Sequence, residues 1–381
     1  MSNAEAFGAN AFFTAGMVIF EVPTGVVADT RGRRTSYLLG TFTLAASTML
    51  YLAMWYASAP FWAWALASTL LGLGFTFFSG AVQAWLVDAL TYSGYFEHGG
   101  QLETVLARGE IVEGAAMLGG SVAGGLIAQA TNLGVPYVLR TIVLGVTFGV
   151  AFALMRDTGF TPAAGKRLPD EIRSILRGSI THGLGNRPVR WIMLEAPFTG
   201  GVSIYAFYAM QPYLLQLYGN QGAYAIAGLA AAIVAGAQIA GGLLVPHLGR
   251  VFRRRTSVLL AGAAVGAGAL AVIGLVPRFW IAIVLLVTWG LVFAAVTPVR
   301  QAYLNTLIES RERATVLSFD SLLSSSGAVA AQPVLGRVAD VWGYPLSYVC
   351  SAGIQALSMP FIWLARRERM TADSLVENVR V

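Results

Sequence analysis

One short stretch of the sequence concentrates charge inside an otherwise apolar region. PTGVVADTRGRRTSYLLG, residues 23–40, contains one acid, three arginines and two glycines that stand close together: Asp29, Arg31, Arg33, Arg34, Gly25 and Gly32. A carboxylate beside guanidinium groups forms charge-assisted hydrogen bonds, which can fasten one segment to another. The stretch lacks histidine and cysteine, so the chemistry that it predicts is ionic contact and not nucleophilic or metal chemistry.

Three further acids stand in apolar surroundings. They are Glu21, Glu113 and Glu195, and the first and third precede a proline by two residues. Ionisable groups inside apolar spans are expensive and are commonly functional, for example in proton relays. Glu113 is a candidate for holding a proton, because burial disfavours the charged form of a carboxyl group. The alternative for all three is an interfacial, gating or packing role.

A fourth acid, Asp88, ends the apolar stretch AWLVDAL, and Arg108 begins another one. Two interpretations are open. Asp88 is either an acid at a helix end in water or a partner of Arg108 in the same ionic network as residues 25–34.

The composition indicates the solvent in which these charges must lie. The 381 residues are 56% hydrophobic and 12% charged, against about 25% charged in an average soluble domain. Outward-facing apolar side chains fit a lipid bilayer. The basic residues occur in scattered short clusters, which argues against a nucleic-acid surface. The sequence indicates no metal site, phosphate-binding loop, nucleophile elbow or cofactor, and its single cysteine excludes an internal disulfide.

The apolar segments are long enough to cross a bilayer, which takes roughly 20 residues each. Eleven spanning helices are predicted, at 7–28, 37–57, 61–90, 104–130, 137–155, 191–217, 223–248, 256–276, 279–307, 313–339 and 345–365. The charged stretch 156–190 divides them. We therefore expect an all-α membrane protein with a five-helix bundle in 1–155, a cytoplasmic loop in 156–190, and a six-helix bundle with a short tail in 191–381.

The distribution of basic residues fixes the expected orientation. With residues 31–34 in the cytoplasm, every arginine and lysine except Arg140, Arg278 and Arg337 falls on the inner side. Such a bias is typical of membrane proteins. It predicts a cytoplasmic C-terminus and an external N-terminus.

Short repeats relate the two halves. VQAWLVDAL (82–90) resembles RQAYLNTLI (300–308), RRTSYLL (33–39) resembles RRTSVLL (254–260), and LGVPY (133–137) resembles WGYPL (342–346). The offsets are similar and the order is the same, as expected for an internal repeat. The repeat predicts a six-plus-six architecture from which the first helix is missing. The rival prediction is a true eleven-helix protein.

GVVADTRGRR, at its place between two early helices of a six-plus-six protein, resembles the cytoplasmic loop signature of the major facilitator superfamily. The longer form EVPTGVVADTRGRR is similar to a bacterial branch near the drug exporters, and GGSVAGG (119–125) resembles part of the antiporter signature. The resemblance implies that Asp29 bonds to Arg33, to Arg34 or to the eleventh family helix, here 313–339. Such contacts would latch the halves together on the inner side. The simpler interpretation is that the arginines only fix topology.

The resemblance also implies which helices line a substrate cavity, here 61–90, 191–217 and 279–307. Their aromatic and amide side chains are candidates for the proton or substrate pathway, although each can equally face lipid or pack: Phe78, Gln83, Tyr205, Tyr208, Gln211, Trp289 and Gln301. We expect a monomeric, non-enzymatic transporter of the bacterial inner membrane, which exports amphipathic small molecules in exchange for protons or another ion. The alternatives are a metabolite importer and a non-transporting receptor or assembly protein.

Overall fold

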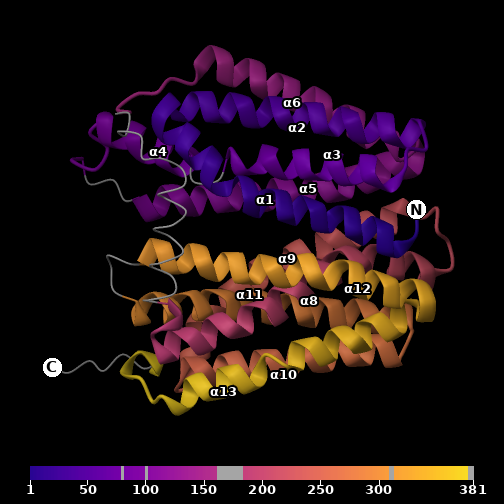
Figure 1. Cartoon of the computed structure of the whole chain (residues 1–381), viewed down its shortest axis with the longest axis vertical. Helices are drawn as coiled ribbons and strands as arrows, with labels where there is room; N and C mark the ends of the chain where they lie inside the picture. The colour runs from indigo at the N-terminus through magenta and orange to yellow at the C-terminus, as the bar shows by residue number, and fades with distance from the viewer. Residues whose placement is uncertain (79–80, 99–101, 161–182, 309–312, 376–381) are drawn as a thin grey trace. The chain divides into compact units, whose positions relative to one another are not determined.

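The computed structural model describes residues 1–78, 81–98, 102–160, 183–308 and 313–375, and within these ranges the chain is helical and contains no strand. The chain forms two compact units. The first unit comprises Met1, Gly8–Ala116 and Ile127–Ile172; the second comprises Ser2–Phe7, Met117–Leu126 and Arg173–Val381. Figure 1 shows the helices of each unit running alongside one another.

The first half of the chain contains six described helices. They are α1 (Asn3–Arg31), α2 (Arg33–Tyr56), α3 (Phe61–Thr76), α4 (Ala81–Tyr92), α5 (Leu102–Ala130) and α6 (Gly134–Leu154). A single residue, Gly32, separates α1 from α2, and its φ of 102° explains why glycine stands there. Residues with side chains rarely adopt that conformation.

The second half also contains six described helices, followed by the short 3₁₀ turn η2 (Thr371–Asp373). They are α8 (Arg187–Tyr218), α9 (Tyr224–Val251), α10 (Arg255–Leu275), α11 (Phe279–Leu307), α12 (Arg313–Ala356) and α13 (Met359–Arg367). A kink at Gly343, with φ of 85° and ψ of 165°, interrupts α12. Pro345 follows the kink, where proline suits the first turn of a new helix.

The described residues include eight helices that are long and apolar enough to cross a membrane. The predicted number of eleven spanning segments is not confirmed by this criterion and stays a prediction. The segment expected at 61–90 is divided between α3 and α4. The helix α3 ends at Thr76, where the amide of Phe78 bonds back to the Phe75 carbonyl at 3.0 Å and tightens the turn.

Two apolar clusters form the core of the second unit. One cluster includes Tyr205, Leu270 and Trp289, and the other includes Ile192 and Leu304. The hydroxyl of the fully buried Tyr205 donates to Ser347 Oγ at 2.7 Å, so that its burial leaves no unpaired donor.

Each half of the chain has an acid that binds the start of its RRTS repeat. Asp157, which follows α6, accepts a 2.7 Å hydrogen bond from the Arg34 amide at the start of α2. Asp373, which follows α13, accepts bonds from the Thr256 amide (2.8 Å) and hydroxyl (2.9 Å) at the start of α10. Both acids satisfy amides that a helix start leaves unbonded.

Candidate functional site

A layer of polar side chains adjoins the apolar clusters of the second unit. Along α8, Glu195 and Thr199 follow Ile192 of one cluster and precede Val202 of the other. Along α11, Arg300 stands between Trp289 and Leu304, which belong to different clusters. Asp320 on α12 completes the layer. We name Glu195, Arg300 and Asp320 the buried cluster.

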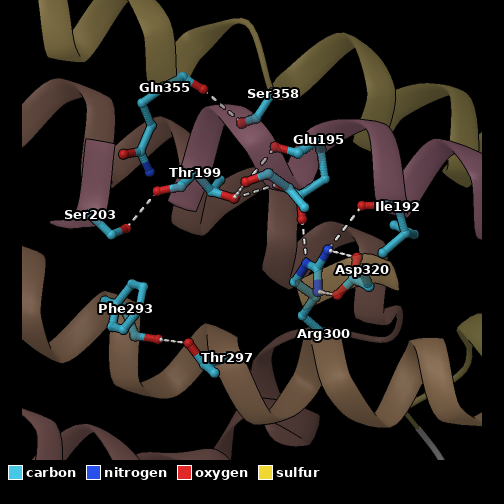
Figure 2. A network of polar contacts seen from close by, with 11 residues as sticks. Ile192, Glu195, Thr199, Ser203, Phe293, Thr297, Arg300, Asp320, Gln355 and Ser358 are labelled. Carbon is cyan, nitrogen blue, oxygen red and sulfur yellow. Dashed lines mark hydrogen bonds and ion pairs between the residues drawn. The ribbon is translucent and has the colours of Figure 1, made fainter. Parts of the chain in front are cut away.

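Arg300 holds the buried cluster together (Figure 2). Its terminal nitrogens donate to both carboxylate oxygens of Asp320, at 2.7 and 2.8 Å, in a bidentate pair. Its Nε donates to Glu195, and Nη2 also donates to the Ile192 carbonyl at 3.0 Å. One guanidinium thus joins three helices, α8, α11 and α12, through charge-assisted bonds that fit its planar geometry.

The buried cluster is shielded from solvent, and its three residues lie at similar distances from the ends of their helices. The side chains of Glu195, Asp320 and Arg300 are 3%, 11% and 16% exposed. Glu195 lies eight residues after Arg187, the first residue of α8, or about 12 Å along the helix axis at 1.5 Å per residue. Arg300 and Asp320 each lie seven residues from an end of their helices, about 10 Å. With all three groups ionised, the cluster has a net charge of −1.

A cavity of about 80 Å³ adjoins the buried cluster on the side of Glu195. Its polar lining includes Glu195, Thr199, Ser203, Thr297, Arg300 and Gln355, and Trp289 and Phe293 are among the apolar residues that close it. The Thr199 hydroxyl donates to Glu195 Oε2 at 3.0 Å, and the Ser203 hydroxyl donates to the Thr199 carbonyl at 2.7 Å (Figure 2). The helices α10 and α13 contribute only uncharged residues to the lining.

The first unit has a second arginine between two carboxylates. Arg33 forms an ion pair with Asp29, four residues away, and its Nε lies 3.9 Å from Asp88 Oδ2. We name these three residues the loop cluster. The Arg33 side chain is 18% exposed, but Asp29 and Asp88 are 51% and 32% exposed. The ion pair of Asp88 recorded among the described residues is with Arg33, which the sequence had not indicated, and not with the expected Arg108.

The rest of the loop is held within the first unit. The Arg34 guanidinium donates to the Phe152 carbonyl at 2.6 Å and lies over the Phe152 ring. The Arg31 side chain is exposed. No described atom lies within 4 Å of the position that a Cβ on Gly25 would occupy, so close packing does not explain this glycine.

The structure brings two of the predicted pathway residues to the cavity, Glu195 and Trp289. The predicted interfacial position of Glu195 differs from its placement in the structure, where it is 2% exposed and bonded to Arg300. Tyr205 belongs to the apolar core and is 0% exposed.

The other predicted pathway residues lie apart from the cavity. Four of the polar ones are exposed: Glu21, Gln83, Glu113 and Gln301. Tyr208 is also exposed, whereas Gln211 and Phe78 are half-buried, and the Phe78 ring packs edge-on against Tyr37 at 4.9 Å. The exposed side chain of Arg108 has no ion pair recorded among the described residues.

Sequence reasoning missed Arg300, Asp320, Asp157 and Asp373. The orientation argument places Arg300 among the basic residues that set topology, and no motif includes Asp320. A usable signal existed, because both stand inside predicted spanning segments, where any charged residue suggests a function. Asp157 follows the helices of the first half, and Asp373 follows those of the second half. Each acid stands at a similar distance after the RRTS sequence of its own half, so the internal repeat could have identified both.

Among the described residues, no group of three or more histidine, cysteine or acidic side chains could hold a metal ion. Arg300 occupies the space between the two carboxylates of the buried cluster, as a bound cation would. The chemistry that the arrangement shows is ion pairing.

Comparison with known families identifies one family. The family model described as Major Facilitator Superfamily matches residues 3–331. The structure resembles a mutant of the nucleoside transporter NupG (TM-score 0.75, 12% identity, 96% of this chain and 91% of that chain). It also resembles the POT-family transporter PepTSo (TM-score 0.71, 14% identity, 96% and 90%). A third similar structure is a bacterial homologue of the human lysosomal transporter Spinster (TM-score 0.66, 15% identity, 98% of this chain and 91% of that chain). No curated protein sequence matches the chain.

Proposed function

The chain belongs to the major facilitator superfamily of membrane transporters, and from that premise we propose that it exports small amphipathic molecules across the bacterial cytoplasmic membrane in exchange for protons. In this proposal eleven segments cross the membrane, divided as 1–155, 156–190 and 191–381, with the C-terminus in the cytoplasm. The bias of basic residues toward one side supports this orientation. Transport proceeds by alternating access, in which two bundles rock around a site near the bilayer midplane.

The observation that carries the proton coupling is the charge of the buried cluster. Two carboxylates and one guanidinium leave a net charge of −1 in the apolar interior, and a single proton makes the cluster neutral. A net charge away from water is costly. The proton is assigned to Glu195, because Asp320 is bound bidentately by Arg300, whereas Glu195 receives one bond from Arg300 and lines the cavity.

Protonation of Glu195 would change the contact between two helices. The Glu195–Arg300 ion pair joins α8 to α11, and a neutral carboxyl group holds the guanidinium less strongly. The contact of α8 with α12 does not depend on charge. A Cβ on Gly201 would lie 2.7 Å from the Gly327 carbonyl, so glycine permits a close backbone approach there. Proton uptake would therefore loosen α8 from α11 while α8 and α12 stay together.

Export is favoured over import by the sequence signatures at 21–34 and 119–125, which resemble those of drug exporters. The solved structures named above are 12–15% identical to this chain, so their likeness concerns the fold alone. Nucleosides and peptides, which are not amphipathic drug-like compounds, therefore belong in a substrate panel as rivals. A chain that moves none of the panel would favour the receptor or assembly alternative.

Transport is tested with purified protein in proteoliposomes that contain a pH-sensitive dye. Amphipathic cations, nucleosides and short peptides are added in turn under an imposed pH gradient. We expect amphipathic compounds to cause proton flux in the wild type and not in Glu195→Gln. The matched control is Glu97→Gln, which changes an exposed glutamate outside both clusters. Proton flux caused only by nucleosides or peptides would replace the export proposal with the import alternative.

Protonation of Glu195 is tested without any substrate. Difference infrared spectra between acidic and neutral pH report carboxyl groups that gain a proton. We expect one carboxyl C=O band that is present in the wild type and in Glu97→Gln but absent in Glu195→Gln. A band that persists unchanged in Glu195→Gln would assign the proton to another acid and contradict the proposal.

A further inference from the structure

The cavity beside Glu195 is too small for the transported molecule. Sites for drug-sized ligands measure about 300–1,000 Å³, whereas this cavity measures about 80 Å³. A single buried water needs about 10–15 Å³. The volume therefore fits a few water molecules.

The lining has the polarity that ordered water requires. Buried waters occupy sites with two to four polar partners, whereas purely apolar cavities stay dry. Here the hydroxyls of Thr199, Ser203 and Thr297 and the carboxylate of Glu195 line one space. The Thr297 hydroxyl donates to the Phe293 carbonyl at 2.8 Å, which leaves its oxygen able to accept a further bond.

Gln355 supplies a second, independent indication of a bound donor. The residue is 8% exposed, and its side-chain oxygen is buried without a hydrogen-bond partner among the described residues. In Figure 2 its side-chain amide points to the same side as Thr199 and Ser203. A buried acceptor without a donor destabilises the folded protein. Water in the cavity removes this cost.

We propose that this cavity holds water and is the route by which protons reach Glu195, with Gln355 as the positioning residue that binds the water. The proposal rests on the proposed protonation of Glu195. The cavity adjoins the carboxylate on the side away from Asp320, which does not line it.

The transfer step is a simple acid–base reaction. A hydronium ion in the cavity gives one proton to a Glu195 carboxylate oxygen, and neutral water and a carboxylic acid remain. Arg300 keeps all its protons, and Asp320 keeps its charge. Within the described part of the chain, Glu195 and Arg300 are the charged groups that line the cavity, and Asp320 contacts Arg300 from outside it.

Water in the cavity is tested by hydroxyl-radical labelling of the intact protein. Radiolysis turns bound water into radicals that oxidise the adjacent aromatic rings. Trp289 lines the cavity and is 4% exposed, whereas Tyr213 is 0% exposed and does not line it. We expect Trp289 to be labelled several-fold faster than Tyr213. Equal labelling of both residues would show a dry cavity and overturn the proposal.

The role of Gln355 is tested with Gln355→Met, which keeps the length of the side chain and removes its polar atoms. We expect several-fold less labelling of Trp289. The matched control is Gln332→Met, which changes another buried glutamine of α12 that does not line the cavity. Should Gln355→Met fail to fold, Ser203→Ala removes a different polar group from the lining. Unchanged labelling in the folded variant would overturn the assignment of Gln355.

The route is tested through the carboxyl band of Glu195. In heavy water this band shifts as the acid exchanges its proton for a deuteron. We expect the shift to be several-fold slower in Gln355→Met than in the wild type and in Gln332→Met. A band that exchanges equally fast in all three proteins would overturn the route, even if Glu195 takes up a proton. If no band depends on Glu195, the proposed protonation fails, and the labelling of Trp289 still decides whether the cavity holds water.

Discussion

The loop cluster of the first unit and the buried cluster of the second unit have the same composition, one arginine between two carboxylates. Their arginines are also equally sheltered, since the side chains of Arg33 and Arg300 are 18% and 16% exposed. The acids differ. Asp29 and Asp88 are 51% and 32% exposed, whereas Glu195 and Asp320 are 3% and 11% exposed.

This difference decides what each arginine does. Water solvates the acids of the loop cluster whether or not Arg33 is present, so the pairing there contributes little energy. The acids of the buried cluster have no such alternative, and Arg300 is their main charged partner. The net charge of the buried cluster is shielded from water, so the gain of one proton should change this cluster strongly. The loop cluster lies at a surface, where a contact can be made and broken at little cost.

The largest effect is expected from removing the buried arginine. Arg300→Met leaves two carboxylates buried and unpaired, and breaking a buried pair in this way costs about 3–5 kcal/mol. Arg33→Met in the loop cluster should cost about 0–1 kcal/mol. Denaturant unfolding of the two purified variants in the same detergent measures both free energies of unfolding.

A rescue variant shows whether charge is the cause. Adding Glu195→Gln and Asp320→Asn to Arg300→Met removes all three charges, and we expect most of the lost stability to return. A triple variant as unstable as Arg300→Met would attribute the loss to packing of the arginine stem. Equal costs for Arg33→Met and Arg300→Met would remove the energetic contrast between the two clusters.

The sequence indicated the loop cluster better than the buried cluster, for a physical reason. Asp29 and Arg33 lie within ten positions, 25–34, so their proximity is visible in the sequence, whereas the contact of Asp88 with Arg33 is not. Glu195, Arg300 and Asp320 are separated by 105 and 20 positions, and only the packing of three helices brings them together. The charge of Arg300 inside an apolar segment was visible, but its partners were not.

The next largest effect is expected at the two acids that bind helix starts, Asp157 and Asp373. Here too the acid of the second half is more buried than the acid of the first half. Asp373 is 3% exposed and accepts two bonds from Thr256, so Asp373→Ala leaves buried donors unpaired at a cost of about 1–3 kcal/mol. Asp157 is half-buried, and Asp157→Ala should cost about 1 kcal/mol, as for other lost helix caps. Thermal unfolding of both variants measures the order. The reverse order would show that burial does not set the strength of these caps.

The helical architecture could be predicted from the sequence more fully than its breaks. Long apolar segments and the bias of basic residues indicate membrane helices directly, because each depends on neighbouring residues alone. The interruption of 61–90 between α3 and α4 was not predicted, since the segment has no proline to indicate it. The kink at Gly343 lies between the predicted segments 313–339 and 345–365.

The smallest effect on stability is expected at Asp29, the most exposed acid of the two clusters. Asp29→Asn removes one surface ion pair, so the free energy of unfolding should fall by about 0–1 kcal/mol and membrane insertion should be intact. If Asp29 also contributes to a latch between the halves, transport must nevertheless weaken, because a latch acts on the equilibrium between conformations and not on folding. Transport rates in proteoliposomes, matched for the amount of inserted protein and compared with Glu97→Gln, measure this. Unchanged transport would contradict the latch and leave the arginines of the loop with a topological role only, and the buried cluster would then be the one of the two that serves the transport cycle.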